Sequence, residues 1–102
     1  MIFDPKKELS ESGIKDLIDF IWNGDGTIIT SKHAKERMKK RGYSFRDIMH
    51  IISNGALVKS EFNNLSGNWK YIFEGEDLDD TSGGVVFSIL SHNECIIITV
   101  LS

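Results

Sequence analysis

The chain has 102 residues, of which 40% are hydrophobic and 26% are charged, and its formal net charge is −3. This size and composition suit one globular domain, so we expect a single domain over residues 1–102. The single cysteine, Cys95, excludes an internal disulfide framework. No apolar run approaches the ~20 residues of a membrane span, and the N-terminal segment lacks the apolar centre of a secretion signal. These features favour a cytoplasmic protein with no membrane partner.

The charged residues are unevenly distributed along the chain. Between Lys32 and Arg46 there are seven lysine or arginine residues and one acidic residue, Glu36. This segment predicts a basic surface on an acidic protein. Acidic residues gather instead between Glu74 and Asp80, without the ligand spacing of a calcium loop. We interpret them as a solvated hairpin tip, and we expect neither a metal nor another cofactor.

Helix signals fill the first half of the chain. Apolar residues at helical spacing, bounded by serine caps and glycine stops, indicate three helices. They are expected from Ser10 or Ser12 to about residue 23, over 31–41 and over 44–54. Residues 27–30 are expected to form a short extended link between the first two helices.

Four short runs of β-branched and aromatic residues follow, separated by turn-forming clusters. The predicted strands cover residues 56–62, 69–74, 85–91 and 95–101. Their tight connections predict an antiparallel meander. The expected fold class is α+β, with two or three N-terminal helices packed on one face of a four-stranded antiparallel sheet.

The two faces of this sheet differ, because successive side chains of a strand point to opposite faces. One face is nearly all apolar and should lie under the helices. Its expected members include Val58, Phe62, Tyr71, Ile96 and Ile98. The opposite face gathers Lys59, Lys70, Ser88 and Thr99. That polar face is either an ordinary wet surface or a surface that holds an RNA phosphate.

Three residues of the second helix stand out. His33, Arg37 and Arg41 recur every four residues and therefore form one stripe. Arginine binds phosphate through paired hydrogen bonds, and histidine transfers protons near neutral pH. A solvated helix face, or a histidine bonded into the local fold, would give the same pattern, so the residues alone leave both interpretations open.

The segment from Thr30 to Ser44 resembles the entry motif of an uncharacterised bacterial domain family close to the RelE/MqsR-like toxin superfamily. In that motif a His-Ala pair is followed by Arg-Met and then Arg-Gly. The matching pairs here are His33-Ala34, Arg37-Met38 and Arg41-Gly42. A basic-aromatic strand at 70–72 and a final strand ending in Thr99-Val100 extend the resemblance over residues 30–101. The first predicted helix extends it toward the MqsR-type toxins.

The resemblance implies a RelE-like fold and the activity of the characterised relatives, which cleave mRNA without a metal ion. The expected function is therefore a metal-independent endoribonuclease, the toxin component of a bacterial type II toxin–antitoxin system. Its implied partners are an RNA substrate and a cognate antitoxin protein. The negative net charge departs from the basic character that is usual in such nucleases.

Metal-independent RNA cleavage needs a base, an acid and cations beside the phosphate. The candidate catalytic residues are His33 as proton carrier, Arg37, Lys59 and Lys70 as charge-stabilising groups, and Tyr71. Candidates for further phosphate contacts are Arg41, Ser88 and Thr99. The positive side chains of the sheet and of the second helix are expected to converge on one phosphate-sized pocket. Tyr71 has an equally good alternative role, because its strand position places it in the core, where it would bond the helix histidine.

Two other functions stay open at this point. The first is a non-catalytic protein-binding module of the same fold, antitoxin-like or immunity-like, whose acidic loop would suit a basic partner. The second is a small-molecule or regulatory domain that uses the polar sheet face.

Overall fold

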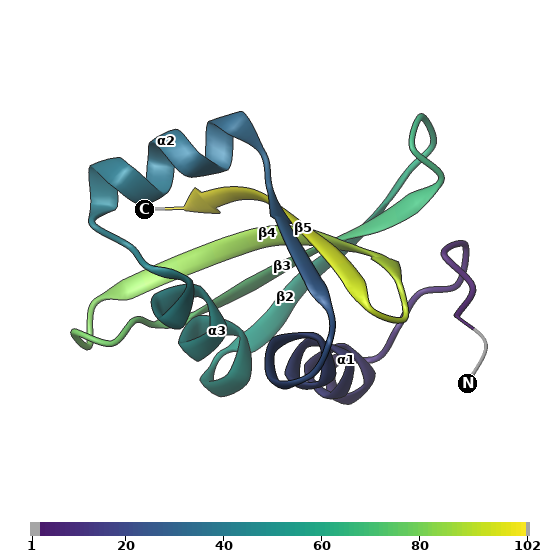
Figure 1. Cartoon of the computed structure of the whole chain (residues 1–102), viewed down its shortest axis with the longest axis horizontal. Helices are drawn as coiled ribbons and strands as arrows, with labels where there is room; N and C mark the ends of the chain where they lie inside the picture. The colour runs from purple at the N-terminus through teal and green to yellow at the C-terminus, as the bar shows by residue number, and fades with distance from the viewer. Residues whose placement is uncertain (1–2, 102) are drawn as a thin grey trace.

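The computed structural model describes residues 3–101, in which three helices and five strands follow one another (Figure 1). The helices are α1 (Glu11–Asn23), α2 (Lys32–Arg41) and α3 (Phe45–Asn54). The strands are β1 (Thr27–Thr30), β2 (Ala56–Asn63), β3 (Asn68–Glu76), β4 (Ser82–Ser91) and β5 (Glu94–Leu101). The chain is thus an α+β protein, as the order of the sequence patterns predicts.

The helix boundaries follow the expected capping residues. The Ser10 hydroxyl accepts a hydrogen bond from Gly13 N at 3.1 Å, and the Ser31 hydroxyl accepts one from Ala34 N at 3.0 Å. In α3, the Asp47 carboxylate accepts from Ser44 N at 3.0 Å. Each bond satisfies a backbone or side-chain group at a helix start, so local chemistry fixes all three N-terminal boundaries.

The sheet has five strands and is mixed, which corrects the expected four-stranded antiparallel sheet. The strand order is β1-β5-β4-β3-β2, and β1 pairs in parallel with β5. Residues 27–30 were therefore wrongly expected to be only a link. A four-residue segment has too few side chains for a clear alternating pattern. Its parallel partner also lies far along the chain, where no turn signal announces the pairing.

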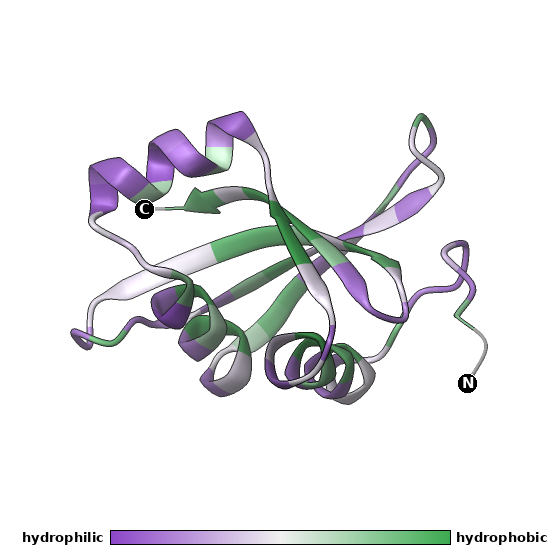
Figure 2. Ribbon diagram, viewed as in Figure 1, coloured by the Kyte–Doolittle hydropathy of each residue, from purple (hydrophilic) through white to green (hydrophobic). Residues whose placement is uncertain are grey.

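One hydrophobic core joins the helices to one face of the sheet. α1 contributes Ile14, Ile18 and Ile21, and α3 contributes Ile48, Ile51 and Ile52, all at most 2% exposed. Tyr71, Phe73 and Phe87 of the central strands lie in the same cluster. Figure 2 shows hydrophobic residues on the strands and on parts of α1 and α3, whereas α2 is mostly hydrophilic. Among the described residues, no helix is long and apolar enough to span a membrane.

A bulge in β5 changes the expected core face. Val86 pairs with Thr99 while the next residue, Phe87, pairs with Ile97, so Ile98 is the extra residue. Cys95, Ile97 and Val100 are consequently buried, whereas Ile96 and Ile98 are only partly buried. The prediction that Ile96 and Ile98 face the core is wrong, because one inserted residue reverses the alternation.

β2 departs from the prediction for a similar reason. Its register shifts between Leu57 and Lys59, and Val58 at this irregularity is 51% exposed. Phe62, near the far end of this edge strand, is 38% exposed and meets Trp69 edge to face with ring centroids 5.6 Å apart. The expected burial of Val58 and Phe62 is therefore wrong.

Gly55 offers a test of the close packing between α3 and the sheet. A Cβ atom at this position would collide with the carbonyl oxygens of Ile51 and Glu74, which are both backbone atoms. We expect Gly55→Ala to lower the free energy of unfolding by ~1–3 kcal/mol, since the backbone must shift. Urea denaturation measures the loss. Ser53→Ala, at an exposed position of the same helix, is the control and should change stability by less than ~0.5 kcal/mol.

Candidate functional site

The sheet face opposite α1 and α3 carries four of the expected site residues, as strand alternation predicts. Strand pairing places Lys59, Ile72, Val86 and Thr99 in one row across β2, β3, β4 and β5. The adjacent row runs Glu61, Lys70, Ser88, Ile96 over the same strands. We call the surface made by these eight residues the outer sheet face. It combines charged groups at the β2–β3 end with an apolar floor toward β5.

Two lysines and a glutamate form a cluster on this face. Lys59 Nζ lies 3.0 Å from Glu61 Oε2, and Lys70 Nζ lies 3.3 Å from Glu61 Oε1. The hydrogen bonds from Lys59 and then Lys70 hold the pKa of the Glu61 carboxyl below its usual range. The three side chains are 59%, 42% and 34% exposed for Lys59, Glu61 and Lys70. This Lys59–Glu61–Lys70 cluster therefore presents a carboxylate between two ammonium groups to solvent, with a local charge of +1.

Glu61 is the functional candidate that the sequence reasoning missed. Two signals pointed to it. Its spacing of two residues from Lys59 puts both side chains on one face of β2. The hairpin pairing also sets Glu61 directly opposite Lys70. The second signal depends on the pairing register, which the six residues between the two predicted strands (63–68) do not reveal.

Ser88 and Thr99 lie on the outer sheet face but offer less to a ligand. Ser88 is 6% exposed, so its hydroxyl lies low between the neighbouring side chains. Thr99 is half-buried, and its Oγ1 lies 3.5 Å from the carbonyl oxygen of Val100. Ser88 and Thr99, together with Ile72 and Val86, form the part of the outer sheet face beside the lysines.

The helix stripe, by which we mean His33, Arg37 and Arg41 of α2, lies along the open edge of β5. Its two arginines bind the backbone of β5. Beyond residue 97, no strand within residues 3–101 covers this edge. The Ser31 hydroxyl donates to Ile98 O at 2.8 Å, Arg37 Nε donates to Val100 O at 3.2 Å, and Arg41 Nη1 donates to Leu101 O at 3.1 Å. These side chains satisfy carbonyl groups that an edge strand would otherwise expose.

The expected convergence of helix and sheet cations on one pocket does not occur. Arg37 and Arg41 are anchored at the β5 edge, while Lys59 stands on β2, three strands away. Neighbouring strands are ~4.8 Å apart, so these anchor points are separated by about 14 Å across the sheet alone. His33 is exposed on α2, the same helix as the two arginines. The predicted site therefore divides into a sheet cluster and a structural helix stripe.

Tyr71 lies on the opposite side of the sheet from the lysines. It is 2% exposed, and its hydroxyl accepts a hydrogen bond from Leu9 N at 2.9 Å. Burial raises the pKa of this phenol. The expected bond to the helix histidine is absent from the contacts of Tyr71, which docks the segment before α1 onto β3 instead.

The acidic hairpin between β3 and β4 is only partly a solvated tip. Asp77 is 4% exposed, and its carboxylate accepts hydrogen bonds from Asp79 N at 2.8 Å, Thr81 N at 3.0 Å and the Tyr43 hydroxyl at 2.8 Å. Arg41 Nη2 in turn donates to the Tyr43 hydroxyl at 2.8 Å. Burial raises the pKa of Tyr43, so this phenol stays protonated and donates to Asp77. The expectation of a solvated cluster is wrong for Asp77, which ties the hairpin to α2.

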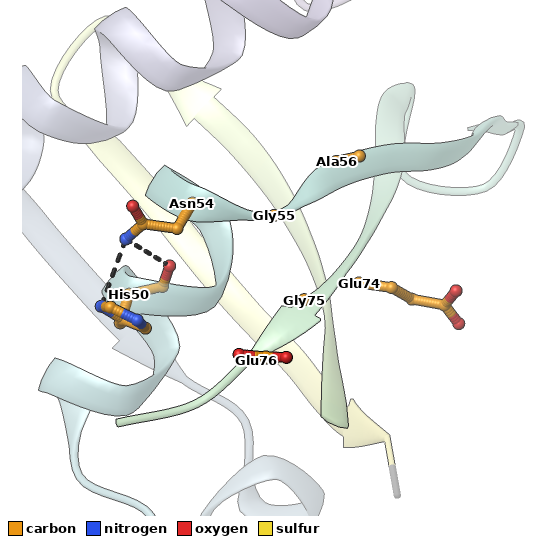
Figure 3. A pocket seen from close by; sticks show the side chains of 7 residues that line it. All are labelled: His50, Asn54, Gly55, Ala56, Glu74, Gly75 and Glu76. Carbon is orange, nitrogen blue, oxygen red and sulfur yellow. Dashed lines mark hydrogen bonds between the residues drawn. The ribbon is translucent and has the colours of Figure 1, made fainter. Parts of the chain in front are cut away.

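A hollow of about 470 Å³ at the end of α3 is unsuitable for a phosphate. Figure 3 shows its lining: His50, Asn54, Gly55, Ala56, Glu74, Gly75 and Glu76. His50 is hydrogen-bonded to Asn54 of its own helix, and the Glu74 side chain points away from these two residues. The lining includes two glutamates, Glu74 and Glu76, and no lysine or arginine, so this hollow repels an anion.

No group of three or more potential metal ligands occurs within residues 3–101. Burial raises the pKa of Cys95 to about 11, so this thiol stays protonated in the core.

Comparison with protein families matches residues 30–102 to the domain of unknown function DUF4258. The chain belongs to the DUF4258 family. The matched region of this DUF4258 protein contains α2, α3 and strands β2–β5. It therefore includes both the helix stripe and the Lys59–Glu61–Lys70 cluster. α1 lies before it. No curated protein and no solved structure matches the chain.

The structural role of the stripe gives a stability prediction. Arg41→Ala removes donors to Leu101 O and to the Tyr43 hydroxyl, and also the guanidinium that lies 4.8 Å above the Tyr43 ring. We expect the free energy of unfolding to fall by ~1.5–3 kcal/mol in chemical denaturation. Lys40→Ala, at the preceding exposed position, is the charge-matched control and should cost less than ~0.5 kcal/mol. Equal losses in both variants would contradict the edge-capping role.

The Asp77 contacts predict a dependence of stability on pH. The hydrogen bond from Thr81 N, followed by that from the Tyr43 hydroxyl, lowers the pKa of Asp77 below its ordinary value of 3.8. A carboxyl group with a lowered pKa stabilises the fold above its unfolded pKa, and this stabilisation is lost as the pH falls through the folded pKa. The stability advantage of the natural protein over Asp77→Asn should therefore be largest above about pH 5 and shrink toward pH 3. Asp79→Asn, at an exposed position of the same loop, is the control for the removal of one charge.

Proposed function

We propose that this DUF4258 protein binds RNA on its outer sheet face and cleaves it without a metal ion. In this proposal it is a RelE-like toxin ribonuclease of a type II toxin–antitoxin system. The observation that carries the proposal is the Lys59–Glu61–Lys70 cluster, in which one carboxylate contacts two ammonium groups at 3.0 and 3.3 Å. The resemblance of the α2 segment and the final strand to an uncharacterised family close to such toxins supports it, as does the preceding helix, which extends the resemblance toward the MqsR-type toxins.

The cluster contains the groups that RNA transesterification requires. Glu61 would take the proton of a ribose 2′-hydroxyl as the 2′-oxygen attacks phosphorus. A lysine ammonium would give a proton to the departing 5′-oxygen as the P–O5′ bond breaks. The second ammonium stabilises the added negative charge on the phosphorane, and the products are a 2′,3′-cyclic phosphate and a free 5′-hydroxyl.

Substrate binding would adjust the base in the useful direction. In the free protein both lysines lower the pKa of Glu61, which keeps the carboxylate ionised at neutral pH. A phosphate anion that draws the lysines toward itself weakens these bonds and adds a nearby negative charge. Both changes raise the pKa of the carboxyl group and make it a stronger base at the moment of attack.

The proposed site differs from the set that the sequence suggests. It retains Lys59 and Lys70, adds Glu61, and leaves His33, Arg37, Arg41 and Tyr71 outside the reacting groups. With two lysines in contact, single-stranded RNA should bind weakly and with a log K–log salt slope of about −1.4. The apolar floor beside the cluster supplies the surface on which a base can rest.

The proposal predicts separate effects for binding and cleavage. Lys59→Ala/Lys70→Ala should abolish binding of a fluorescent single-stranded RNA at low salt, and with it RNA loss and growth arrest in expressing bacteria. Glu61→Gln should keep the binding, because the lysines remain, and lose cleavage by a factor of ~10²–10⁴.

Lys39→Ala/Lys40→Ala is the matched control, since it removes two exposed lysines from α2 and the same amount of charge. It should leave both activities unchanged. If this control weakens RNA binding as strongly as the sheet variant does, the basic helix rather than the sheet is the RNA surface. If Glu61→Gln still cleaves at the natural rate, Glu61 is not the base.

A further inference from the structure

A second surface lies on the other side of the molecule, beside α1. A groove of about 530 Å³ is lined by Leu9, Gly13, Asp16, Leu17, Phe20 and His92. Leu9 and Leu17 pack their inner sides against the core, and Phe20 is 55% exposed. We call this the α1 groove. Its walls are mostly apolar, and among residues 3–101 no segment covers Phe20.

Gly13 keeps the groove open. A glycine inside a helix costs ~0.5–1 kcal/mol relative to alanine. Apart from α1's own backbone, a Cβ atom at Gly13 would meet only the Ser10 hydroxyl, at 3.2 Å. This distance is short for a Cβ contact, so the N-cap serine would have to shift by a few tenths of an ångström. What a larger side chain would fill is the groove itself.

The surroundings of the groove are acidic. α1, which supplies most of the lining, carries three acidic residues (Glu11, Asp16 and Asp19) and a single lysine. The lysine, Lys15, is engaged with Gly55 O at 2.8 Å and with Glu11 at 3.9 Å. Asp16 lines the groove and makes no ion pair within the described residues. An apolar groove whose lining carries the carboxylate of Asp16 complements a ligand that is apolar on one side and basic on the other.

The position of the groove separates it from the RNA site. α1 packs against the core side of the sheet, opposite the Lys59–Glu61–Lys70 cluster (Figure 1). α1 also precedes residues 30–102, the part that matches the DUF4258 family. The groove therefore lies mostly outside the matched residues, which contribute His92 of the β4–β5 turn.

We propose that the α1 groove binds a basic amphipathic helix of a partner protein. Apolar side chains of the partner helix, spaced one helical turn apart, enter between Leu17 and Phe20. Lysine or arginine residues on either side of them in the partner helix face Asp16 and Asp19. This inference does not depend on the proposed ribonuclease activity, because it concerns another surface and another type of ligand.

The test uses a synthetic helical peptide of about 16 residues with leucine on one face and lysine on the other. Fluorescence anisotropy measures its binding to the full chain, and backbone amide NMR shifts locate it. The natural protein should bind it with shifts confined to α1 and the β4–β5 turn. Gly13→Leu, which fills the groove without changing charge, should weaken binding at least about tenfold.

Charge variants and a second peptide complete the test. Asp16→Lys should weaken binding, whereas Asp79→Lys, an equal charge change at the exposed β3–β4 loop, should not. The same peptide with glutamate in place of lysine should not bind. The proposal is overturned if Gly13→Leu binds the lysine peptide like the natural protein, or if both peptides bind equally. It is also overturned if sedimentation shows a dimer that Gly13→Leu dissociates, because the occupant would then be a second copy of the chain.

Discussion

The open edge of β5 is the constraint on which the arrangement of this molecule depends. β5 joins the short parallel strand β1 to the antiparallel meander, yet β1 pairs with it only from Glu94 to Ile97. The rest of the strand would expose unpaired carbonyl groups. Ser31, Arg37 and Arg41 meet this need from α2, each by a hydrogen bond to β5. A buried or edge carbonyl left without a donor is costly, so these side chains are committed to the fold.

Because Arg37 and Arg41 bind the backbone of β5, they are not the cations that can contact a ligand on the sheet. Arg41 also joins Tyr43 and Asp77, so that α2, the loop after it and the β3–β4 hairpin form one hydrogen-bonded unit. The cations that remain for a ligand on the sheet are lysines, and they stand at the opposite end of the strand order. The charged helix stripe and the charged sheet face are thus two separate features: the arginines of the first stabilise the fold, and the second is the surface that we propose binds RNA.

Local sequence signals predicted the helices and the long strands, because each depends on caps, stops and side-chain periods within a few residues. They did not predict β1 or the bulges at Val58 and Ile98, since these depend on pairing between distant segments. The same division holds for the site. Strand alternation brought Lys59 and Lys70 to one face, as observed. The role of Glu61 required the hairpin register, and the role of the arginines required knowledge of which carbonyls lacked a partner.

The irregular start of β2 has a consequence for the behaviour of the protein in concentrated solution. β2 is an outer strand, paired only with β3, and its free side could template the addition of a strand from another molecule. The bulge at Val58 breaks the regular spacing of its backbone groups, and the charged side chains of Lys59 and Glu61 follow directly. A strand that is both kinked and charged is a poor template for fibre growth. The residues that present a carboxylate and ammonium groups to a ligand therefore also help to keep separate molecules apart.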